Sequence, residues 1–282
     1  IDTIMYTIID KVQLTEGIFK MIITAPHVAK SWKPGQFVVV MVNEIGERIP
    51  LTIVDGNTYH GTISLIFQVV GKTTALLASK NVGEQIYSVT GPLGRPSEIK
   101  RYGKVVLVGG GVGAAEILPQ AKALKQIGNY VIAIIGARSA NKLILVEELE
   151  SLCDKVHVCT DDGSFGFKGF VSDALSKLIE EEGEINFVYA VGPVPMMRAV
   201  SKVTQDYNIK TVVSANPIMI DGTGMCGVCR VIVGGEIKFA CIDGPDFDAH
   251  LLDFNTLESR LKTYMKYERK AFEDFMRCQC HG

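Results

Sequence analysis

A change of pattern near residue 100 limits the possible folds of this chain most strongly. Residues 104–110 read KVVLVGG, a continuous apolar run, and a Gly-rich turn, a helical stretch and the apolar run YVIAIIGA follow. A strand that is apolar along its whole length is typical of a parallel sheet covered on both faces. The segment therefore predicts a βαβ unit, in which a helix connects two parallel strands.

The same alternation continues to about residue 216. Apolar runs alternate with helical stretches, so we expect about five strands in a doubly wound domain. Residues 1–98 instead contain short alternating strands, which predict an antiparallel β-barrel or sandwich with TTALLASKN as its only helix. The predicted fold class is β + α/β, with a barrel at 1–98, a doubly wound domain with a parallel sheet at 99–217, a cysteine-containing hairpin segment at 218–254 and a helical tail at 255–282.

Composition excludes several classes of function. The formal net charge is -2, so no basic field is available to attract nucleic acid. The longest apolar runs are much shorter than the roughly 20 residues that cross a bilayer, and we expect neither a membrane span nor a signal peptide. The seven cysteines are bunched toward one end, unlike those of a secreted disulfide protein, so we expect a reducing, cytoplasmic location.

The Gly-rich turn GGGVG lies between the first strand and the first helix of the doubly wound domain. Glycine lets the backbone approach a pyrophosphate, and the start of a helix attracts its negative charge. The strand that follows ends in GARSANK, without the acidic residue that would select NAD, although Asp161 and Asp162 after the next strand are candidates for a ribose contact. The turn predicts a nucleotide site at Gly109, Gly110, Gly111 and Gly113.

Two short motifs in the barrel segment give a second nucleotide signal. RIPLT, from Arg48 to Thr52, places a guanidinium, a rigid proline and a hydroxyl on one strand. GKTT, from Gly71 to Thr74, places backbone N–H groups, an ammonium and hydroxyls at a helix start, which suits a pyrophosphate. Taken separately, each motif has a structural explanation that is as good as the functional one: RIPLT fits an edge strand with a surface arginine, and GKTT fits a plain capped helix.

Three cysteines near the end of the chain have the spacing of metal ligands. Cys226 and Cys229 have two residues between them, and Cys241 follows across the hairpin CRVIVGGEIKFAC. Thiolates at this spacing bind zinc or an iron–sulfur cluster, and both usually take four protein ligands. Zinc would be a structural staple, whereas an iron–sulfur cluster beside a nucleotide domain would carry electrons.

The ordered set of motifs resembles the ferredoxin reductase family of flavoproteins over nearly the first 216 residues. The resemblance implies FAD on the barrel and a nicotinamide nucleotide on the doubly wound domain. It implies that Thr52 donates a hydrogen bond to flavin N5, where the hydride arrives. Its other implied contacts are Arg48 near the flavin phosphates, Pro50 and Leu51 beside the flavin ring, Gly71, Lys72, Thr73 and Thr74 on the pyrophosphate, and Gly192 and Pro193 beside the nicotinamide nucleotide.

The cysteine segment resembles the [2Fe–2S] segment of flavin subunits that pass electrons from NADH to dihydroorotate dehydrogenase. In that pattern a further cysteine lies five residues ahead of the C-x-x-C pair, and here Asp221 occupies the position. A carboxylate can bind ferric iron and is a harder ligand than a thiolate. The resemblance thus implies Asp221, Cys226, Cys229 and Cys241 as ligands. Cys278, Cys280 and His250 are rival fourth ligands, and Asp221 is preferred because the loop already delivers it.

SANPIMIDGTGMCGVC, followed by a hairpin and CIDGPDFDAH, is similar to the small subunits of the electron-bifurcating NADH-dependent reduced ferredoxin:NADP oxidoreductases, also described as sulfide dehydrogenase β subunits. The resemblance implies FAD, a [2Fe–2S] cluster and NAD(H) in this chain. It also implies a larger partner subunit with a second FAD and two [4Fe–4S] clusters, which handles NADP(H) and ferredoxin. The alternatives are an electron-transfer subunit for dihydroorotate dehydrogenase, which Asp221 disfavours, one for sulfide or sulfur reduction, and a zinc-stapled nucleotide-binding regulator.

Overall fold

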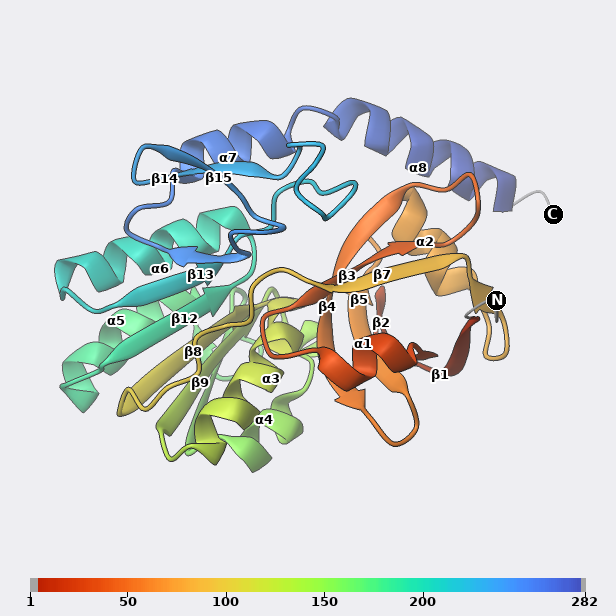
Figure 1. Cartoon of the computed structure of the whole chain (residues 1–282). Helices are drawn as coiled ribbons and strands as arrows, with labels where there is room; N and C mark the ends of the chain where they lie inside the picture. The colour runs from red at the N-terminus through yellow and green to blue at the C-terminus, as the bar shows by residue number, and fades with distance from the viewer. Residues whose placement is uncertain (1–4, 280–282) are drawn as a thin grey trace.

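The N-terminal part of the chain, residues 6–93, forms a nearly closed antiparallel barrel, as predicted (Figure 1). A computed structural model describes residues 5–279. Seven strands pair in the order β6-β1-β2-β5-β4-β3-β7, and all their pairings are antiparallel. Their bounds are β1 Tyr6–Thr15, β2 Ile18–Thr24, β3 Phe37–Met41, β4 Arg48–Asn57, β5 Thr62–Gln68, β6 Gln85–Ile86 and β7 Ser88–Leu93.

Two short helices accompany the barrel, although the sequence predicts only one. The expected helix is α2, Lys72–Ser79. The prediction that it is the only helix is wrong, because α1 spans Pro26–Ser31 and buries Val28 and Ala29 against the barrel. A helix of six residues is too short to show a 3.6-residue apolar repeat, so the periodicity of the sequence does not reveal it.

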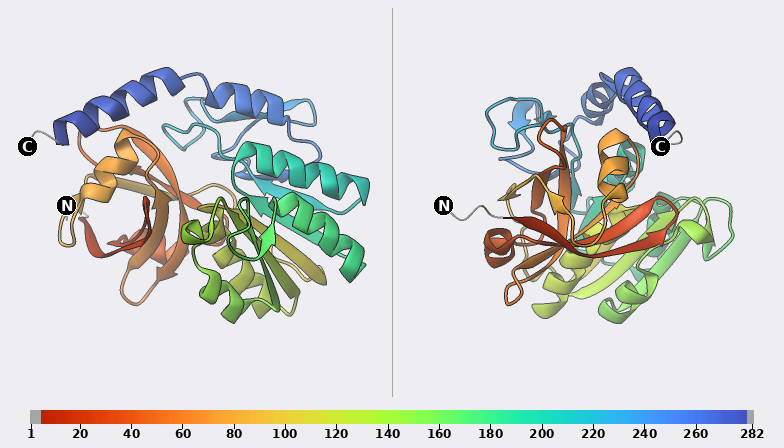
Figure 2. Two further views of the ribbon diagram at one scale, coloured as in Figure 1. Left: turned by 180° about the vertical axis from the view of Figure 1, so that it is seen from behind. Right: turned by 90° about the vertical axis from the view of Figure 1, so that its right-hand side faces the viewer.

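The second half of the described chain forms a mixed, mostly parallel sheet with helices on both faces (Figures 1 and 2). Its strand order is β11-β10-β9-β8-β12-β13-β16, and only β13 and β16 are antiparallel. The bounds are β8 Lys104–Gly110, β9 Tyr130–Ala137, β10 Lys155–Thr160, β11 Phe167–Lys168, β12 Phe187–Val191, β13 Thr211–Ser214 and β16 Asp246–Asp248; the helices are α3 Gly113–Gln126, α4 Val146–Leu152, α5 Val171–Glu182 and α6 Val194–Asp206, with a 3-10 turn at Ala140–Lys142.

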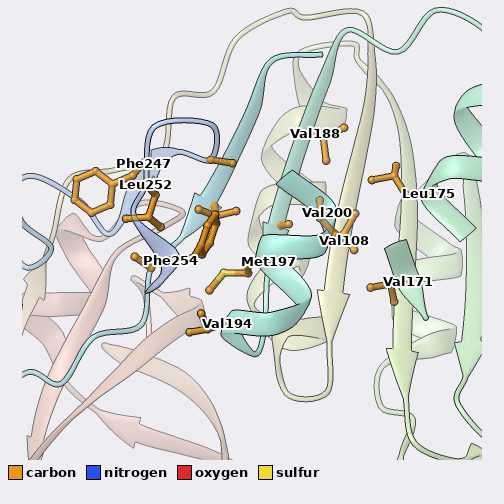
Figure 3. Close-up of a cluster of buried hydrophobic side chains, with 14 of the residues drawn as sticks. Val108, Val171, Leu175, Val188, Val194, Met197, Val200, Phe247, Leu252 and Phe254 are labelled. Atoms are coloured by element: carbon orange, nitrogen blue, oxygen red, sulfur yellow. The ribbon is translucent and has the colours of Figure 1, made fainter. Parts of the chain in front are cut away.

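The continuous apolar run of β8 is explained by these two layers of helices. Val105 and Leu107 point to the face covered by α3 and α4, whereas Val106 and Val108 point to the face covered by α5 and α6. Successive side chains of a strand alternate between faces, so a strand between two layers must be apolar throughout. Figure 3 shows the second of these cores, where valines of the sheet meet Leu175 and Met197 of the covering helices.

The remaining C-terminal segment forms a hairpin and two helices. The strands β14, Arg230–Val233, and β15, Glu236–Phe239, confirm the predicted hairpin. The tail forms two helices: α7, Phe254–Leu261, packs on α6, and α8, Met265–Gln279, crosses above the barrel to reach α2 (Figures 1 and 2). Within residues 5–279 no helix is both long enough and apolar enough to span a bilayer.

Candidate functional site

A cleft of about 480 Å³ lies where the barrel meets the second sheet. Its walls come from strands β3, β4 and β5 and the start of α2 on one side, and from the carboxyl ends of β8, β12 and β13 on the other. Ligands of open α/β sheets bind at this edge. Nine of the predicted cofactor residues line the cleft: Pro50, Leu51, Thr52, Thr74, Gly110, Gly111, Gly113, Gly192 and Pro193.

Other predicted cofactor residues lie outside the cleft wall. Arg48 is exposed at the start of β4, opposite Met41 of β3. Gly71, Lys72 and Thr73 lie at the start of α2, and Gly109 lies within β8. Much of the cleft wall was not predicted from the sequence, above all the segment from Ser214 to Met219, which follows β13. Its position after a buried strand was the available signal, since such strand ends converge at one edge of a parallel sheet.

The start of α2 differs in detail from the prediction. The residue that caps the helix is Gly71, ahead of both threonines. The Thr74 hydroxyl accepts hydrogen bonds from the N–H groups of Val70 and Gly71, each at 3.0 Å, so the Gly71 N–H is not free for a phosphate. Thr73 donates to the Glu47 carboxylate at 2.9 Å. The N–H groups of the first helical turn remain for an anion, and the space above Gly71 is open.

The glycines of the GGGVG turn have two separate roles. A Cβ atom on Gly113 would lie 2.3 Å from the carbonyl oxygen of Val191, so this glycine allows α3 to approach β12 closely. Gly109 likewise permits close packing, because its Cβ would lie 2.9 Å from the backbone of Ala114. Gly111 has a φ of +58° and no heavy atom within 4 Å of an added Cβ. Its backbone is therefore open to the cleft, as a pyrophosphate site requires.

A carboxylate that the sequence reasoning missed lies in the same cleft. Glu116 is in the first turn of α3 and lines the cleft wall. The Thr52 hydroxyl donates a hydrogen bond of 3.0 Å to its Oε2 atom, so the two motifs meet side chain to side chain. Burial raises the pKa of Glu116 to about 7, the bond from Thr52 opposes the rise, and the negative charge of Asp246 adds to it. The signal was an acidic residue directly after the Gly-rich turn.

A second carboxylate, Asp246 of β16, ties the surrounding elements together. The Tyr189 hydroxyl of β12 donates to its Oδ1 atom at 3.1 Å, and the Ser97 hydroxyl donates to its Oδ2 atom. Gln120 of α3 donates in turn to the Ser97 hydroxyl at 2.7 Å. Burial raises the pKa of Asp246 to about 6, while the two hydroxyl donors lower it. The network fixes α3 and the interdomain linker, residues 94–103, on the edge of the sheet.

The predicted iron–sulfur ligands occur as two pairs in the structure. In the first pair, Asp221 accepts hydrogen bonds from the Thr223 hydroxyl at 2.5 Å and from the Cys226 N–H at 3.3 Å. These bonds, that of Thr223 first, lower the pKa of Asp221, so the carboxylate is ionised. The Asp221 side chain thus folds over the loop that carries the exposed Cys226.

The second pair consists of Cys229 and Cys241, from the two ends of the β14–β15 hairpin. Both are buried, and their Sγ atoms lie 3.2 Å apart. Burial raises the pKa of Cys241 to about 12, and the hydrogen bond from Cys229 adds to the shift. A buried thiol whose pKa is raised in this way needs a compensating cation before it can become a thiolate.

The pairing bears on the kind of metal group that would fit. Among the described residues, no three His, Cys, Asp or Glu side chains are grouped closely enough for one metal ion. Two separate pairs match a two-iron cluster, in which each iron takes two protein ligands, better than one tetrahedral zinc ion, which needs four around a single point.

The structure does not bring the described rival ligands to this loop. His250 makes a 3.0 Å hydrogen bond with Thr204 of α6. Cys278 lies in the last turns of α8, beside the barrel and at the far end of the molecule from the β14–β15 hairpin (Figures 1 and 2). Cys280 lies outside the described residues. Asp161 and Asp162, the candidate ribose contacts, are exposed in the turn after β10 and do not line the cleft.

The loop from Asp221 to Cys229, called the cluster loop below, is held against the barrel. A Cβ atom on Gly222 would lie 2.7 Å from Leu93 and 2.9 Å from Val39, so the loop backbone rests directly on β7 and β3. The buried Cys229 and Cys241 belong to the same apolar core as Phe37, which lines the cleft. The cleft and the cysteine pair therefore border the same extended apolar core.

Arg95 fastens the interdomain linker to the turn that follows Cys241. Its side-chain Nε donates to the Ile242 carbonyl at 3.0 Å, and its backbone N–H donates to the Gly244 carbonyl at 2.7 Å. Its guanidinium also lies 3.6 Å from the Asp243 carboxylate. Arg95 thus adds a second attachment of this segment, beside the contacts of Gly222 with β3 and β7.

Two segments of the chain match known families. Residues 216–253 match the iron–sulfur cluster binding domain of dihydroorotate dehydrogenase B, and residues 107–202 match the oxidoreductase NAD-binding domain. The first match contains Asp221 and the three hairpin cysteines, and the second contains the Gly-rich turn and Gly192-Pro193.

Full-length relatives agree with these matches. The chain is 46% identical to a dihydroorotate dehydrogenase B (NAD(+)) electron transfer subunit homolog of Thermotoga maritima, over 98% of this chain and 97% of that protein. It is 34% identical to the corresponding electron transfer subunit of Bacillus velezensis, over 84% and 93% of the two chains.

A solved structure gives the same answer and confirms the resemblance expected from the motifs. A chain from the NADH-dependent reduced ferredoxin-NADP oxidoreductase structure, described as giving insights into flavin-based electron bifurcation, is 46% identical. It superimposes with a TM-score of 0.92, covering 97% of this chain and 99% of that one. The chain belongs to the family of dihydroorotate dehydrogenase B electron transfer subunits and their homologues, together with this chain of the NADH-dependent reduced ferredoxin-NADP oxidoreductase.

Proposed function

We propose that this chain is the electron-transfer flavoprotein subunit of an electron-bifurcating NADH-dependent ferredoxin:NADP oxidoreductase. One observation carries the proposal: the cleft that joins Thr52 to the Gly-rich turn shares an apolar core with the buried Cys229–Cys241 pair. The full-length similarity to a chain of such an oxidoreductase supports the same function. The arrangement suits a chain that receives a hydride at one site and releases single electrons at the other.

The cleft fits FAD on the barrel side. The open space above Gly71, the first-turn N–H groups of α2 and the exposed Lys72 suit a pyrophosphate, while Pro50, Leu51 and Thr52 form a wall for the flavin ring. Arg48, at the start of the same strand, is the proposed phosphate partner. When bound, FAD would accept a hydride and give up its two electrons one at a time.

The opposite wall fits NAD(H). The open backbone at Gly111 and the start of α3 would bind the pyrophosphate, and Gly192-Pro193 would border the nicotinamide half. A hydride passes only over a short distance and needs no acid or base of its own. The work of the protein is therefore to orient the reactants and to exclude water, which the apolar Phe37 and Leu51 walls do.

The hairpin segment fits a [2Fe–2S] cluster, which would carry one electron at a time. Asp221 and Cys226 would bind one iron, and Cys229 and Cys241 the other, because Asp221 already accepts a hydrogen bond from the Cys226 backbone N–H and the Sγ atoms of Cys229 and Cys241 already lie together. Loss of the thiol protons would be driven by the positive iron ions. Backbone N–H groups of the loop at Met225 and Cys226, which now bond to Asp221, would help to set the potential.

We propose a larger partner subunit, since electrons that leave the hairpin need an acceptor. The relatives named as electron transfer subunits support this inference. The resemblance stated above supplies the finer proposal, a subunit with a second FAD and two [4Fe–4S] clusters that reacts with ferredoxin and NADP(H). We also propose a cytoplasmic location, which the odd number of cysteines supports.

The test is anaerobic purification followed by a visible spectrum and metal analysis. We expect flavin bands with a broad iron–sulfur absorption, about two irons per chain, and bleaching by NADH. A colourless protein that contains zinc would contradict the proposal and favour a nucleotide-binding regulator.

A second candidate is an electron-transfer subunit for dihydroorotate dehydrogenase. The names of the relatives from Thermotoga maritima and Bacillus velezensis favour it. Purification of the native complex separates the two candidates: dihydroorotate oxidation coupled to NAD⁺ supports the second, whereas NADH- and ferredoxin-dependent reduction of NADP⁺ supports the first.

A further inference from the structure

We propose that the Glu116 carboxylate, acting through the Thr52 hydroxyl, accepts the proton that is left behind when the electrons of a hydride leave the flavin singly. Neither the matched families nor the names of the relatives assign a role to Glu116. The inference rests on the proposed function, because it requires a hydride donor and a one-electron acceptor at the same site.

The chemistry leaves one proton to be removed. A hydride from NADH carries two electrons and one proton, so NADH yields NAD⁺, two electrons and one H⁺ when the final acceptor takes electrons only. A bound [2Fe–2S] cluster and the partner subunit would accept the two electrons in single steps. The proton that arrived with the hydride would then have to leave the flavin, so its N–H bond would break as a base in the cleft forms the new O–H bond.

The geometry offers a two-step route for this proton. Thr52 lies on the wall proposed for the flavin ring, and its hydroxyl is held by Glu116 at 3.0 Å. A hydroxyl can receive a proton on its oxygen while it passes its own proton to the carboxylate behind it. Glu116 ends the route with a bound proton, and its position in the cleft wall lets it release that proton when the cleft is open to solvent.

The environment of Glu116 suits a group that binds and releases a proton near neutral pH. It is held in a largely apolar wall, and the raised pKa described above agrees with that position. The charged group that acts on it from another element is Asp246 of β16, which is itself hydrogen-bonded to Ser97 and Tyr189. Lys122, farther along α3, is paired with Asp55 of β4 at 3.7 Å. Negative charge around Glu116 therefore favours its protonated form.

The first experiment uses the protein without cofactors. Infrared difference spectra recorded between pH 5 and 9 should contain a carboxyl band that titrates near neutrality and that disappears in Glu116→Gln. Glu147→Gln, an exposed residue of α4 away from the cleft, is the matched control and should leave the band in place. If the neutral band is absent from the unmodified protein, Glu116 is not the proton acceptor.

The second experiment uses the FAD- and cluster-loaded protein in a stopped-flow instrument. NADH should bleach the flavin of Glu116→Gln at nearly the normal rate, whereas the following electron release to a one-electron acceptor should slow by roughly 10- to 100-fold and lose its solvent deuterium isotope effect. Thr52→Val should slow the electron release and abolish its isotope effect in the same way, whatever its effect on the preceding hydride step, and Glu116→Asp should recover part of the release rate. Unchanged release with an unchanged isotope effect in Glu116→Gln overturns the inference.

The two proposals fail in different ways. If the unmodified protein is not bleached by NADH, or carries no flavin, the proposed function itself is wrong. If the unmodified protein is bleached and passes electrons normally but Glu116→Gln does the same, only the proton route is wrong. If Glu116→Gln does not take up FAD, the infrared titration and the Thr52→Val kinetics decide the matter.

Discussion

Cys229 and Cys241 lie twelve residues apart in the chain, but the β14–β15 hairpin brings their Sγ atoms to within 3.2 Å. Both are buried in the core that also contains Phe37 of the barrel. An electron held at this pair would therefore sit behind the wall of the cleft and not on the molecular surface. The more exposed side of the loop, with Cys226 and Asp221, faces outward.

Asp221→Cys should retain a cluster and shift its reduction potential. A thiolate donates more electron density to iron than a carboxylate does, and the hydrogen bond from Thr223 to the carboxylate would be lost. Electron paramagnetic resonance of the reduced protein gives the measurement. Thr223→Ala, which removes the same hydrogen bond but retains the carboxylate, is the control. A spectrum of Asp221→Cys identical to that of the unmodified protein would remove Asp221 from the ligand set.

Cys226→Ser should separate the two halves of the electron path. We expect NADH to reduce the FAD at nearly the normal rate, because the cleft is unaltered, and coupled activity with the partner subunit to fall by at least about 100-fold, because a damaged cluster interrupts the only one-electron route. Cys278→Ser, in the last turns of α8, provides the comparison and should leave both activities intact. Normal coupled activity of Cys226→Ser would show that Cys226 is not a ligand of the working cluster.

Gly111→Ala should weaken NADH binding without emptying the flavin site. The residue has a φ of +58°, so alanine there is strained by about 1–2 kcal/mol, and its methyl group would project into the space proposed for the pyrophosphate. Gly17→Ala is matched for strain, since Gly17 has a φ of +75° and equally open surroundings but lies in the β1–β2 turn. Both variants should lose similar stability in urea unfolding. Only Gly111→Ala should raise the KM for NADH, by roughly 10-fold; equal KM values would argue against this use of the turn.

The stability of the cofactor-free protein should depend on pH through Glu116. The pKa of Glu116 rises from 4.5 to about 7 on folding, so the folded state binds this proton more tightly than the unfolded state. The free energy of unfolding therefore falls, by about 3 kcal/mol at most, as the pH rises from 4.5 to about 7. Above that range this residue causes no further change. Glu116→Gln lacks the titration, so it should become more stable than the unmodified protein as the pH rises from 5 to 8.

Urea unfolding at a series of pH values measures this difference. Glu147→Gln should follow the unmodified protein at every pH. A constant difference between Glu116→Gln and the unmodified protein from pH 5 to 8 would mean that Glu116 does not have a raised pKa.

The sequence predicts a barrel followed by a mostly parallel sheet because the two parts differ in the periodicity of their apolar residues. The alternating barrel strands and the continuous apolar strands of the sheet depend on which faces are buried, and this is visible in residues such as Val105 to Val108. The short helix α1 and the division of the tail into α7 and α8 do not follow from such a pattern. Strand β16 is only three residues long, and its pairing with β13 depends on contacts more than thirty residues distant in the chain.

The part of the cleft formed by the Gly-rich turn was predictable, whereas contacts between two side chains were not. Gly111 lines the cleft because it belongs to a turn between a strand and a helix, a position that the sequence reveals. Glu116 is an ordinary acidic residue in the first turn of a helix until α3 packs against β4 and brings it to Thr52. The hydrogen bond from Thr74 to the Gly71 N–H likewise depends on the exact start of α2, which sequence reasoning fixes only to within a few residues.

The pairing of β13 with β16 makes the ligand-bearing segment a separate insertion at the edge of the sheet. Ser214 stands opposite Asp246, and the Ala215 N–H donates to the Pro245 carbonyl at 2.9 Å, so the chain leaves the sheet and returns to it at one point. The segment between Ser214 and Asp246 contains all four proposed ligands, and it leaves the sheet and rejoins it at the same edge. Such a segment can be gained or lost without altering the order of the other strands, and its loss would remove the four proposed cluster ligands while leaving the barrel and the Gly-rich turn in place.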